Sequence, residues 1–154
     1  MFVEKGYLFQ GMSSEFMDEI SRNLIRETHA KGDLLFRAGD PADFLYVLED
    51  GRVRLSAGDR GIVTRIVEKK GDALGWSSLV GREAYSSSAE CLTDARIVKI
   101  NKDVLNEIFN RYPACGLLLF RRLARLIGER LLENYHQLSA HHAEKGTSGY
   151  GYGG

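Results

Sequence analysis

Turn-forming residues recur at short intervals between residues 28 and 101, and they separate short runs of apolar residues. The turn groups lie at residues 31–33, 38–41, 49–51, 58–61 and 69–72. The apolar runs lie at residues 34–36, 44–48, 53–55, 62–67 and 95–100. Asp50-Gly51 and Asp59-Arg60-Gly61 are typical of tight hairpin turns. The pattern therefore predicts short antiparallel strands that form a small sandwich or barrel of the jelly-roll type.

Helical periodicity is found on either side of this region. The first helix is expected over residues 13–27, with one of the two serines at its start as the capping residue. The second is expected over residues 102–109, capped by Asn101. Pro113 suits the first turn of a longer helix over residues 113–138. We therefore expect an α+β fold: a jelly-roll barrel of about eight antiparallel strands, flanked by one N-terminal and two C-terminal helices.

The length of the chain, 154 residues, suits one domain with its own core. We place this domain at residues 7–138 and expect residues 139–154, rich in Gly and Tyr, to form a flexible tail. The 21 basic and 21 acidic side chains cancel, which argues against a dedicated nucleic-acid binder. No run reaches the ~18 apolar residues of a membrane span, and the first residues do not resemble a signal peptide. We therefore expect a soluble, cytoplasmic protein with no membrane contact.

Few residues are suited to catalysis or metal binding. His29 is the single histidine before residue 136, whereas an enzyme on a similar barrel, such as a cupin, needs a cluster of metal-binding histidines. Cys91 and Cys115 have no CxxC spacing and are interpreted as buried small hydrophobic residues. The sequence thus predicts no enzyme, no metal and no resident cofactor.

Residues 32–53, with their glycines in turn positions and their Phe and Tyr in strand positions, closely resemble the first half of the cyclic nucleotide-binding domain family. Residues 8–13 also resemble the entry to that family's N-terminal helix, and the resemblance covers residues 7–138. It implies a regulatory domain that binds a cyclic nucleotide in a phosphate-binding cassette. In the family this cassette holds a Gly-Glu pair that reaches the ribose, a short helix, and an arginine that neutralises the cyclic phosphate.

Residues 71–89 match this cassette in outline, but both of its charged residues are replaced. Gly75 matches the cassette glycine, Trp76 stands where the glutamate is expected, and Tyr85 stands at the arginine position. A hydrogen bond to a charged group contributes about 1.5–3 kcal/mol, so the loss of two should weaken binding of cyclic AMP or cyclic GMP by about two to four orders of magnitude. The candidate ligand-binding residues, all from this segment, are Gly75, Trp76, Ser77, Ser78, Leu79, Arg82, Tyr85, Ser86 and Ser87.

Several of these residues have more than one interpretation. Arg82 could swing in to replace the missing arginine, which would supply an anionic ligand with a partner. Trp76 either stacks on a planar ligand or fills core space at the edge of the barrel. The cassette serines either bind a polar ligand or cap the short helix and line a solvated loop.

The helix expected over residues 113–138 carries an apolar seam at heptad spacing with one polar position. The seam comprises Leu117, Phe120, Ala124, Ile127, Leu131, Asn134 and Leu138. A second apolar stripe comprises Leu119, Leu123 and Leu126. One stripe should cover the barrel, and the other could pair with a second subunit or a partner protein, unless both are buried within one domain.

The same helices are locally basic at Arg111, Arg121, Arg122, Arg125 and Arg130, which we interpret as a solvated face with Glu129 and Glu133 as counter-charges. We expect no DNA contact, because no helix-turn-helix fits after residue 138. The leading hypothesis is a regulatory or sensory domain that signals through its C-terminal helix and binds cyclic AMP or cyclic GMP weakly or not at all. The alternative is a ligand-free interaction module that uses this helix to dock a partner.

Overall fold

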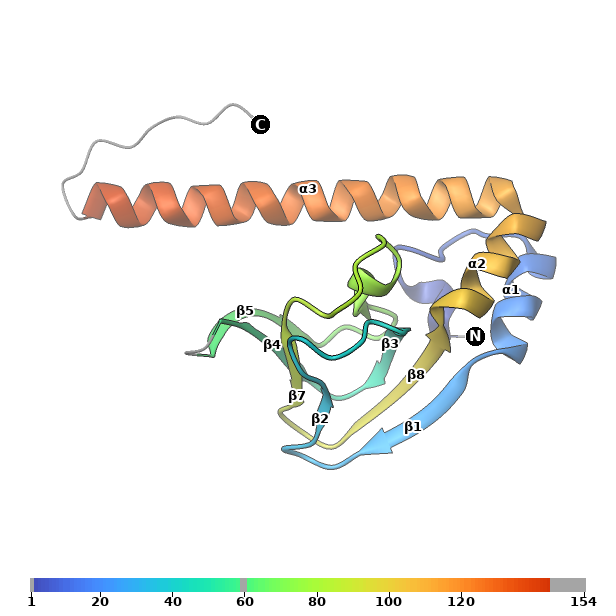
Figure 1. Cartoon of the computed structure of the whole chain (residues 1–154), viewed down its shortest axis with the longest axis horizontal. Coiled ribbons are helices and arrows are strands. Elements are labelled where there is room, and N and C mark those ends of the chain that lie inside the picture. Colours follow the sequence, from blue (N-terminus) through green and yellow to red (C-terminus); the bar gives the residue numbers. More distant parts are fainter. Residues whose placement is uncertain (1, 59–60, 145–154) are drawn as a thin grey trace. The chain divides into compact units, whose positions relative to one another are not determined.

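A computed structural model describes residues 2–58 and 61–144 of the chain (Figure 1). The chain divides into two compact units, one of residues 1–116 and a second that begins at Leu117. The first unit contains all of the described strands and two of the three α-helices. It carries the candidate ligand site.

Two four-stranded antiparallel sheets form the barrel of the first unit, which confirms the predicted jelly-roll fold. The first sheet has the order β1-β8-β3-β6 and the second the order β2-β7-β4-β5. The strands of the first sheet are β1 (Ile25–His29), β8 (Ala95–Asn101), β3 (Phe44–Asp50) and β6 (Ala73–Leu74). The strands of the second are β2 (Leu34–Phe36), β7 (Ser88–Cys91), β4 (Val53–Ala57) and β5 (Ile62–Val67).

Alternation along β3 gives the first sheet two buried faces. Tyr46 and Leu48 belong to the core cluster between the sheets, together with Phe36 of β2 and Val53 of β4. The intervening Leu45 and Val47 are also buried, and side chains alternate between the faces of a strand. They therefore lie on the opposite face, which the helices cover. β3 is buried on both sides and is the central element of the fold.

The helical cover comprises η1 (Phe2–Lys5), α1 (Ser14–Arg22) and α2 (Lys102–Arg111). Phe16 of α1 is fully buried and stacks on Phe109 of α2, with ring centroids 6.2 Å apart. The Oγ atom of Ser13 accepts a hydrogen bond from the N–H of Phe16 and so caps α1. Asn101 caps α2, as predicted: its Oδ1 atom accepts hydrogen bonds from the first-turn amides.

The helix predicted over residues 13–27 is wrong in its last part. The helix α1 ends at Arg22, and residues 25–29 form β1, which pairs with β8 from Ile25↔Lys99 to His29↔Ala95. Ile25 and Thr28 are β-branched, and their pairing with an adjacent strand overrides the helical spacing of the apolar residues before them. The short strands β6 and β7 were likewise not predicted, because two and four residues carry little periodicity.

The long helix α3 (Pro113–Glu144) begins at the predicted proline and continues six residues beyond Leu138. The first residues of the expected tail, 139–144, are therefore helical, and residues 145–154 lie outside the described part of the chain. The strands β4 and β5 pair antiparallel, as the second hairpin signal predicts, although Asp59 and Arg60 of its turn are also outside the described residues. Among the described helices, none combines the length and hydropathy needed to cross a bilayer.

Candidate functional site

Gly75 occupies the position that is least tolerant of a side chain in the candidate site. Its φ angle is 80°, in the left-handed region that glycine adopts most readily. A Cβ atom here would lie 3.1 Å from the carbonyl oxygen of Phe44 and 3.2–3.3 Å from the rings of Tyr46 and Tyr85. Backbone conformation and close packing therefore both select glycine at the entrance to the cassette.

The short helix η2 (Trp76–Ser78) follows at once and uses one of the candidate serines internally. Ser78 is buried, and its Oγ atom donates a hydrogen bond of 2.8 Å to the carbonyl oxygen of Gly75. The hydroxyl of Ser78 therefore closes the helix turn, which agrees with the capping interpretation for this serine. Ser77 and Trp76 are half-buried.

Tyr85 lies in the interior of the barrel and is only 5% exposed. Its hydroxyl donates to the carbonyl oxygen of Phe44 at 2.6 Å and accepts from the N–H of the same residue at 3.1 Å. Its ring stacks on Phe36 with centroids 3.9 Å apart, and Phe36 packs in turn against Tyr46 at 5.4 Å. The residue at the expected arginine position is thus an uncharged member of the core with its hydroxyl fully bonded.

Both buried tyrosines stay neutral at physiological pH. Burial raises the pKa of Tyr46, and the nearby phenol of Tyr85 adds to this effect. Burial also raises the pKa of Tyr85, despite the opposing hydrogen bond to the backbone of Phe44. Neither tyrosine supplies a charge to the cassette.

A second loop holds the segment before Tyr85 in place. Tyr85 donates its N–H to the carbonyl oxygen of Asp40 at 3.0 Å, and its own carbonyl accepts from Gly39 at 2.9 Å. Pro41 forms an isolated antiparallel bridge with Ala84. This connection directs the ring of Tyr85 into the barrel. The turn signal at residues 38–41 was visible in the sequence, but its partner was not.

The other candidate residues differ in their exposure. Arg82 is exposed, and its guanidinium has no hydrogen-bond or ion-pair partner within residues 2–58 and 61–144. Ser86 is exposed and Ser87 is half-buried. Leu79 is buried. The cassette therefore brings Gly75, Ser78 and Tyr85 together in the interior and leaves Arg82 at the surface.

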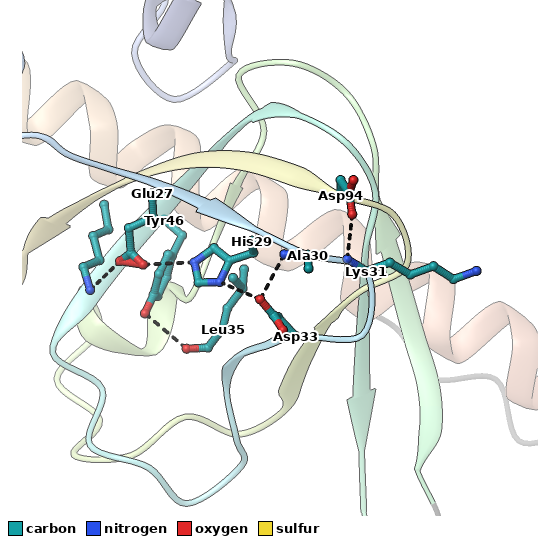
Figure 2. Close-up of polar contacts among 9 residues, drawn as sticks. Glu27, His29, Ala30, Lys31, Asp33, Leu35, Tyr46 and Asp94 are labelled. Carbon is teal, nitrogen blue, oxygen red and sulfur yellow. Dashed lines mark hydrogen bonds and ion pairs between the residues drawn. The ribbon is translucent and has the colours of Figure 1, made fainter.

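A polar cluster at the β1 edge of the first sheet was not predicted as a unit (Figure 2). Glu27 forms an ion pair with Lys99 at 2.6 Å and a hydrogen bond with Nε2 of His29 at 2.9 Å. Nδ1 of His29 lies 3.7 Å from Oδ2 of Asp33. The ammonium of Lys99 also lies 4.3 Å above the ring centroid of Phe44. The location of His29 on a strand is confirmed, and the alternation of Glu27 and His29 was the available signal for a shared face.

This cluster lies on the face of the sheet that points into the barrel. Lys99 is paired with the core residue Tyr46, and Glu27 with the core residue Ile97. Directly paired residues project from the same face of a sheet. Burial raises the pKa of the Glu27 carboxyl, but the bonds from Lys99 and His29 outweigh it and bring the pKa below its ordinary value.

The described residues contain no group of three or more His, Cys, Asp or Glu side chains arranged to hold a metal ion. Cys91 is buried, as predicted, and burial raises the pKa of its thiol. Cys115 is only half-buried, so the prediction of a buried residue is wrong there. It lies near the start of α3, where its sulfur contacts the hydroxyl of Ser13 at 3.7 Å.

Comparison with known proteins agrees with this fold. The family model described as "Cyclic nucleotide-binding domain" matches residues 26–112, which is more than half of the chain. The chain therefore belongs to the cyclic nucleotide-binding domain family. Its fold is that of a regulatory, signalling domain.

Individual relatives are similar over most of this chain. The N-terminal domain of a transcriptional regulator from Streptomyces coelicolor is 26% identical, with a TM-score of 0.70 over 84% of this chain and 94% of that one. The catabolite activator protein of Thermus thermophilus is 25% identical, with a TM-score of 0.70 over 86% of this chain and 62% of that one. The CRP-like cAMP-activated global transcriptional regulator of Mycobacterium tuberculosis is 26% identical over 122 residues, 77% of this chain and 54% of that protein. Among the curated relatives it matches first, the chain spans 54% of the length of the Mycobacterium tuberculosis regulator and 17% of the length of a cyclic nucleotide-gated channel beta-3 from Canis lupus familiaris.

Proposed function

We propose that this chain is a regulatory domain whose cassette binds cyclic AMP and cyclic GMP weakly or not at all, and whose signal leaves through α3. The domain acts in the cytoplasm as a sensory or regulatory unit and performs no catalysis of its own. The family match and the regulatory relatives support the assignment as a regulatory domain. The replaced cassette residues support weak or absent binding of cyclic AMP and cyclic GMP.

The single observation that carries the proposal is the burial and full hydrogen bonding of Tyr85. A cyclic phosphate is an anion, and its recognition requires a charged donor or several aligned donors. Tyr85 directs its hydroxyl to the backbone of Phe44 instead, so it has no donor left for a ligand. Trp76 lacks the carboxylate that would accept from a ribose hydroxyl. Together the two replacements predict a loss of about two to four orders of magnitude in affinity.

A thermal-shift screen separates a changed ligand from a lost one. Arg82 is exposed and lacks a partner among the described residues, and the cassette serines offer neutral hydroxyls. A small anion that uses these groups would raise the Tm of the wild type and lose its effect in Arg82→Ala. Nucleotides, cyclic dinucleotides and inorganic anions are the probes for this screen. A ligand whose shift is unchanged in Arg82→Ala would show that this residue does not replace the cassette arginine.

A second candidate function is a ligand-free interaction module, and the apolar seam of α3 favours it. Leu117, Ile127, Leu131 and Leu138 recur at heptad spacing and are all exposed. Such a seam is suited to a second helix, either from another copy of this chain or from a partner protein. A homodimer through residues 113–138 is the simpler form. Light scattering on a dilute sample tests it, because a monomer would contradict self-pairing, and a co-purifying protein would then indicate a heterologous partner.

A further inference from the structure

Arg65 lies on the inner face of the barrel wall, which is unusual for a charged side chain. Its strand, β5, is at the edge of the second sheet, beside β4 (Figure 1). Arg65 pairs with Leu55 and lies two residues before Val67, and both of these residues belong to the core cluster. Directly paired residues, and residues two apart in a strand, project from the same face. The side chain of Arg65 therefore starts from the face that points into the barrel.

The burial along β5 is the reverse of that in an ordinary amphipathic strand. Ile62, Val63 and Ile66 are 65%, 50% and 40% exposed, whereas Arg65 is half-buried. The Nε atom of Arg65 is buried and has no hydrogen-bond partner among the residues that the structure describes. A guanidinium carries its positive charge throughout in proteins, and a buried charge without a partner is unfavourable. The strand thus holds an uncompensated cation in the barrel wall.

The acidic side chains closest to β5 in the sheet and the sequence neutralise other arginines. Glu90 is the single carboxylate in the described strands of the second sheet, and it forms an ion pair with Arg54 at 2.5 Å. Glu68, which follows β5, forms an ion pair with Arg52 at 3.1 Å. Arg65 has no ion-pair partner within residues 2–58 and 61–144. A carboxylate or phosphate from outside the chain would supply the missing counter-charge.

The surroundings of Arg65 indicate what kind of ligand would carry this counter-charge. A guanidinium donates two parallel N–H bonds to the oxygens of a carboxylate or a phosphate. Leu55 and Val67 flank Arg65 on the same face, and their core cluster includes Leu74 and Tyr85 of the cassette segment. A ligand with one anionic group and an apolar portion matches both features. An inorganic anion matches the charge alone.

We propose that Arg65 is the anion-binding residue of this barrel, and that its ligand is a small organic carboxylate or phosphate with an apolar portion. The inference rests on the proposed function, because it gives the regulatory domain a ligand in place of cyclic AMP or cyclic GMP. The positive charge that the cassette lacks at Tyr85 is supplied from β5 instead. The ligand class changes together with the position of the charge.

Two other roles for Arg65 make different predictions. An inward-pointing charge on an edge strand can prevent that strand from pairing with another chain. An arginine can also cover apolar surface with its aliphatic stem while its guanidinium reaches water. Neither role involves a saturable response to an anion, and in both of them the loss of the charge would leave the Tm unchanged or lower it.

Thermal unfolding of the ligand-free wild type and of Arg65→Met, at constant ionic strength, is the first measurement. Methionine keeps much of the apolar stem and has no charge, so Arg65→Met should unfold about 2–4 °C above the wild type. Arg54→Met is the matched control in the same sheet, and it should show no gain, because Glu90 loses its partner. A Tm of Arg65→Met at or below that of the wild type would overturn the proposal.

Titration with benzoate and with phenyl phosphate is the second measurement, and benzyl alcohol is the uncharged control. At least one of the two anions should raise the Tm of the wild type and of Arg54→Met in a saturable manner. Its dissociation constant should rise by about 10–100-fold in Arg65→Met, because a charge-assisted bond is lost. Inorganic phosphate should give the weaker response. A missing response in the wild type, or a response that Arg65→Met retains, would refute the role of Arg65.

Arg65→Lys keeps the test decisive if Arg65→Met does not fold. Lysine retains the charge but lacks the two parallel donors, so the dissociation constant should rise by about tenfold, and an unchanged value would refute the proposal. Cyclic AMP and cyclic GMP in the same assay separate this inference from the proposed function. Submicromolar binding of either nucleotide by the wild type would contradict the proposed function, whereas a missing response to both benzoate and phenyl phosphate would refute this inference alone.

Discussion

The hydroxyl of Tyr85 binds both backbone polar groups of Phe44, donating to its carbonyl oxygen at 2.6 Å and accepting from its N–H at 3.1 Å. Phe44 is the first residue of β3, the strand that is buried on both faces. A residue of the cassette loop is thereby fixed to the central strand of the barrel. The contact gives Tyr85 a structural role.

Tyr85→Phe should destabilise the protein by about 1–3 kcal/mol. The ring would still stack on Phe36, but the N–H and carbonyl oxygen of Phe44 would lose their partner in a partly buried site. Tyr46→Phe is the comparison, because the hydroxyl of Tyr46 makes a longer bond of 3.4 Å to the carbonyl oxygen of Leu35, beside its interaction with the Tyr85 hydroxyl, and its loss should cost less. Chemical denaturation of the three proteins measures the difference. Equal losses of stability in the two variants would show that the hydrogen bonds between Tyr85 and Phe44 contribute no more than the bond of Tyr46.

Gly75→Ala should cost more than an alanine substitution at another left-handed glycine. The φ strain alone costs about 1–2 kcal/mol, and at Gly75 the new Cβ would also press against Phe44 at 3.1 Å. Gly81→Ala is the control, since its φ is 77° and no heavy atom lies within 4 Å of the added Cβ. The difference between the two free energies of unfolding measures the cost of the close contacts around Gly75, because both positions share the cost of the left-handed conformation. We expect Gly75→Ala to be the less stable, and the reverse order would contradict the packing described around β3.

Asn101→Ala should lower the free energy of unfolding by about 1 kcal/mol. The side chain accepts hydrogen bonds from two amides at the start of α2, at 2.8 and 3.3 Å, and alanine cannot replace them. Asn106→Ala in the same helix is exposed and should be neutral or slightly stabilising, because alanine has the higher helix propensity. Urea denaturation of both variants checks the contrast. The same free energy of unfolding for both variants would show that the Asn101 cap does not stabilise the protein.

Lys99→Met should destabilise the protein at pH 7 and much less at acid pH. The ion pair with Lys99 helps to hold the pKa of Glu27 below its ordinary value, and its loss leaves a half-buried carboxylate poorly compensated. A lowered folded-state pKa stabilises above the unfolded value, and this stabilisation is lost as pH falls through the folded-state pKa. The stability difference from the wild type should therefore shrink below about pH 4.5. A difference that stays constant from pH 7 to pH 3 would exclude the ionic contribution of Lys99.

The spacing of turns and apolar runs was sufficient to predict the barrel and most of its long strands. Most of these runs are buried on at least one face, although Ile62 and Val63 of β5 are exposed. The beginning of β1 was missed because apolar residues up to Ile25 have helical spacing, and only the pairing with β8 reveals the strand. The assignment of the cassette to the segment around Gly75 stays a prediction. The direction in which the side chain of Tyr85 points could not be predicted, because it depends on the loop at Asp40, which is distant in sequence. The cluster of Glu27, His29 and Lys99 was hidden for the same reason, since β1 and β8 are about seventy residues apart.

Isothermal titration calorimetry of the wild type with cyclic AMP and cyclic GMP measures the affinity of the cassette for cyclic nucleotides. We expect no binding, or dissociation constants well above the micromolar range, for both. The double variant Trp76→Glu with Tyr85→Arg, which returns the two charged groups, should bind more tightly than the wild type if it remains folded by circular dichroism. A submicromolar dissociation constant for either nucleotide in the wild type would show that the cassette binds cyclic nucleotides despite the replacement of Glu and Arg by Trp76 and Tyr85.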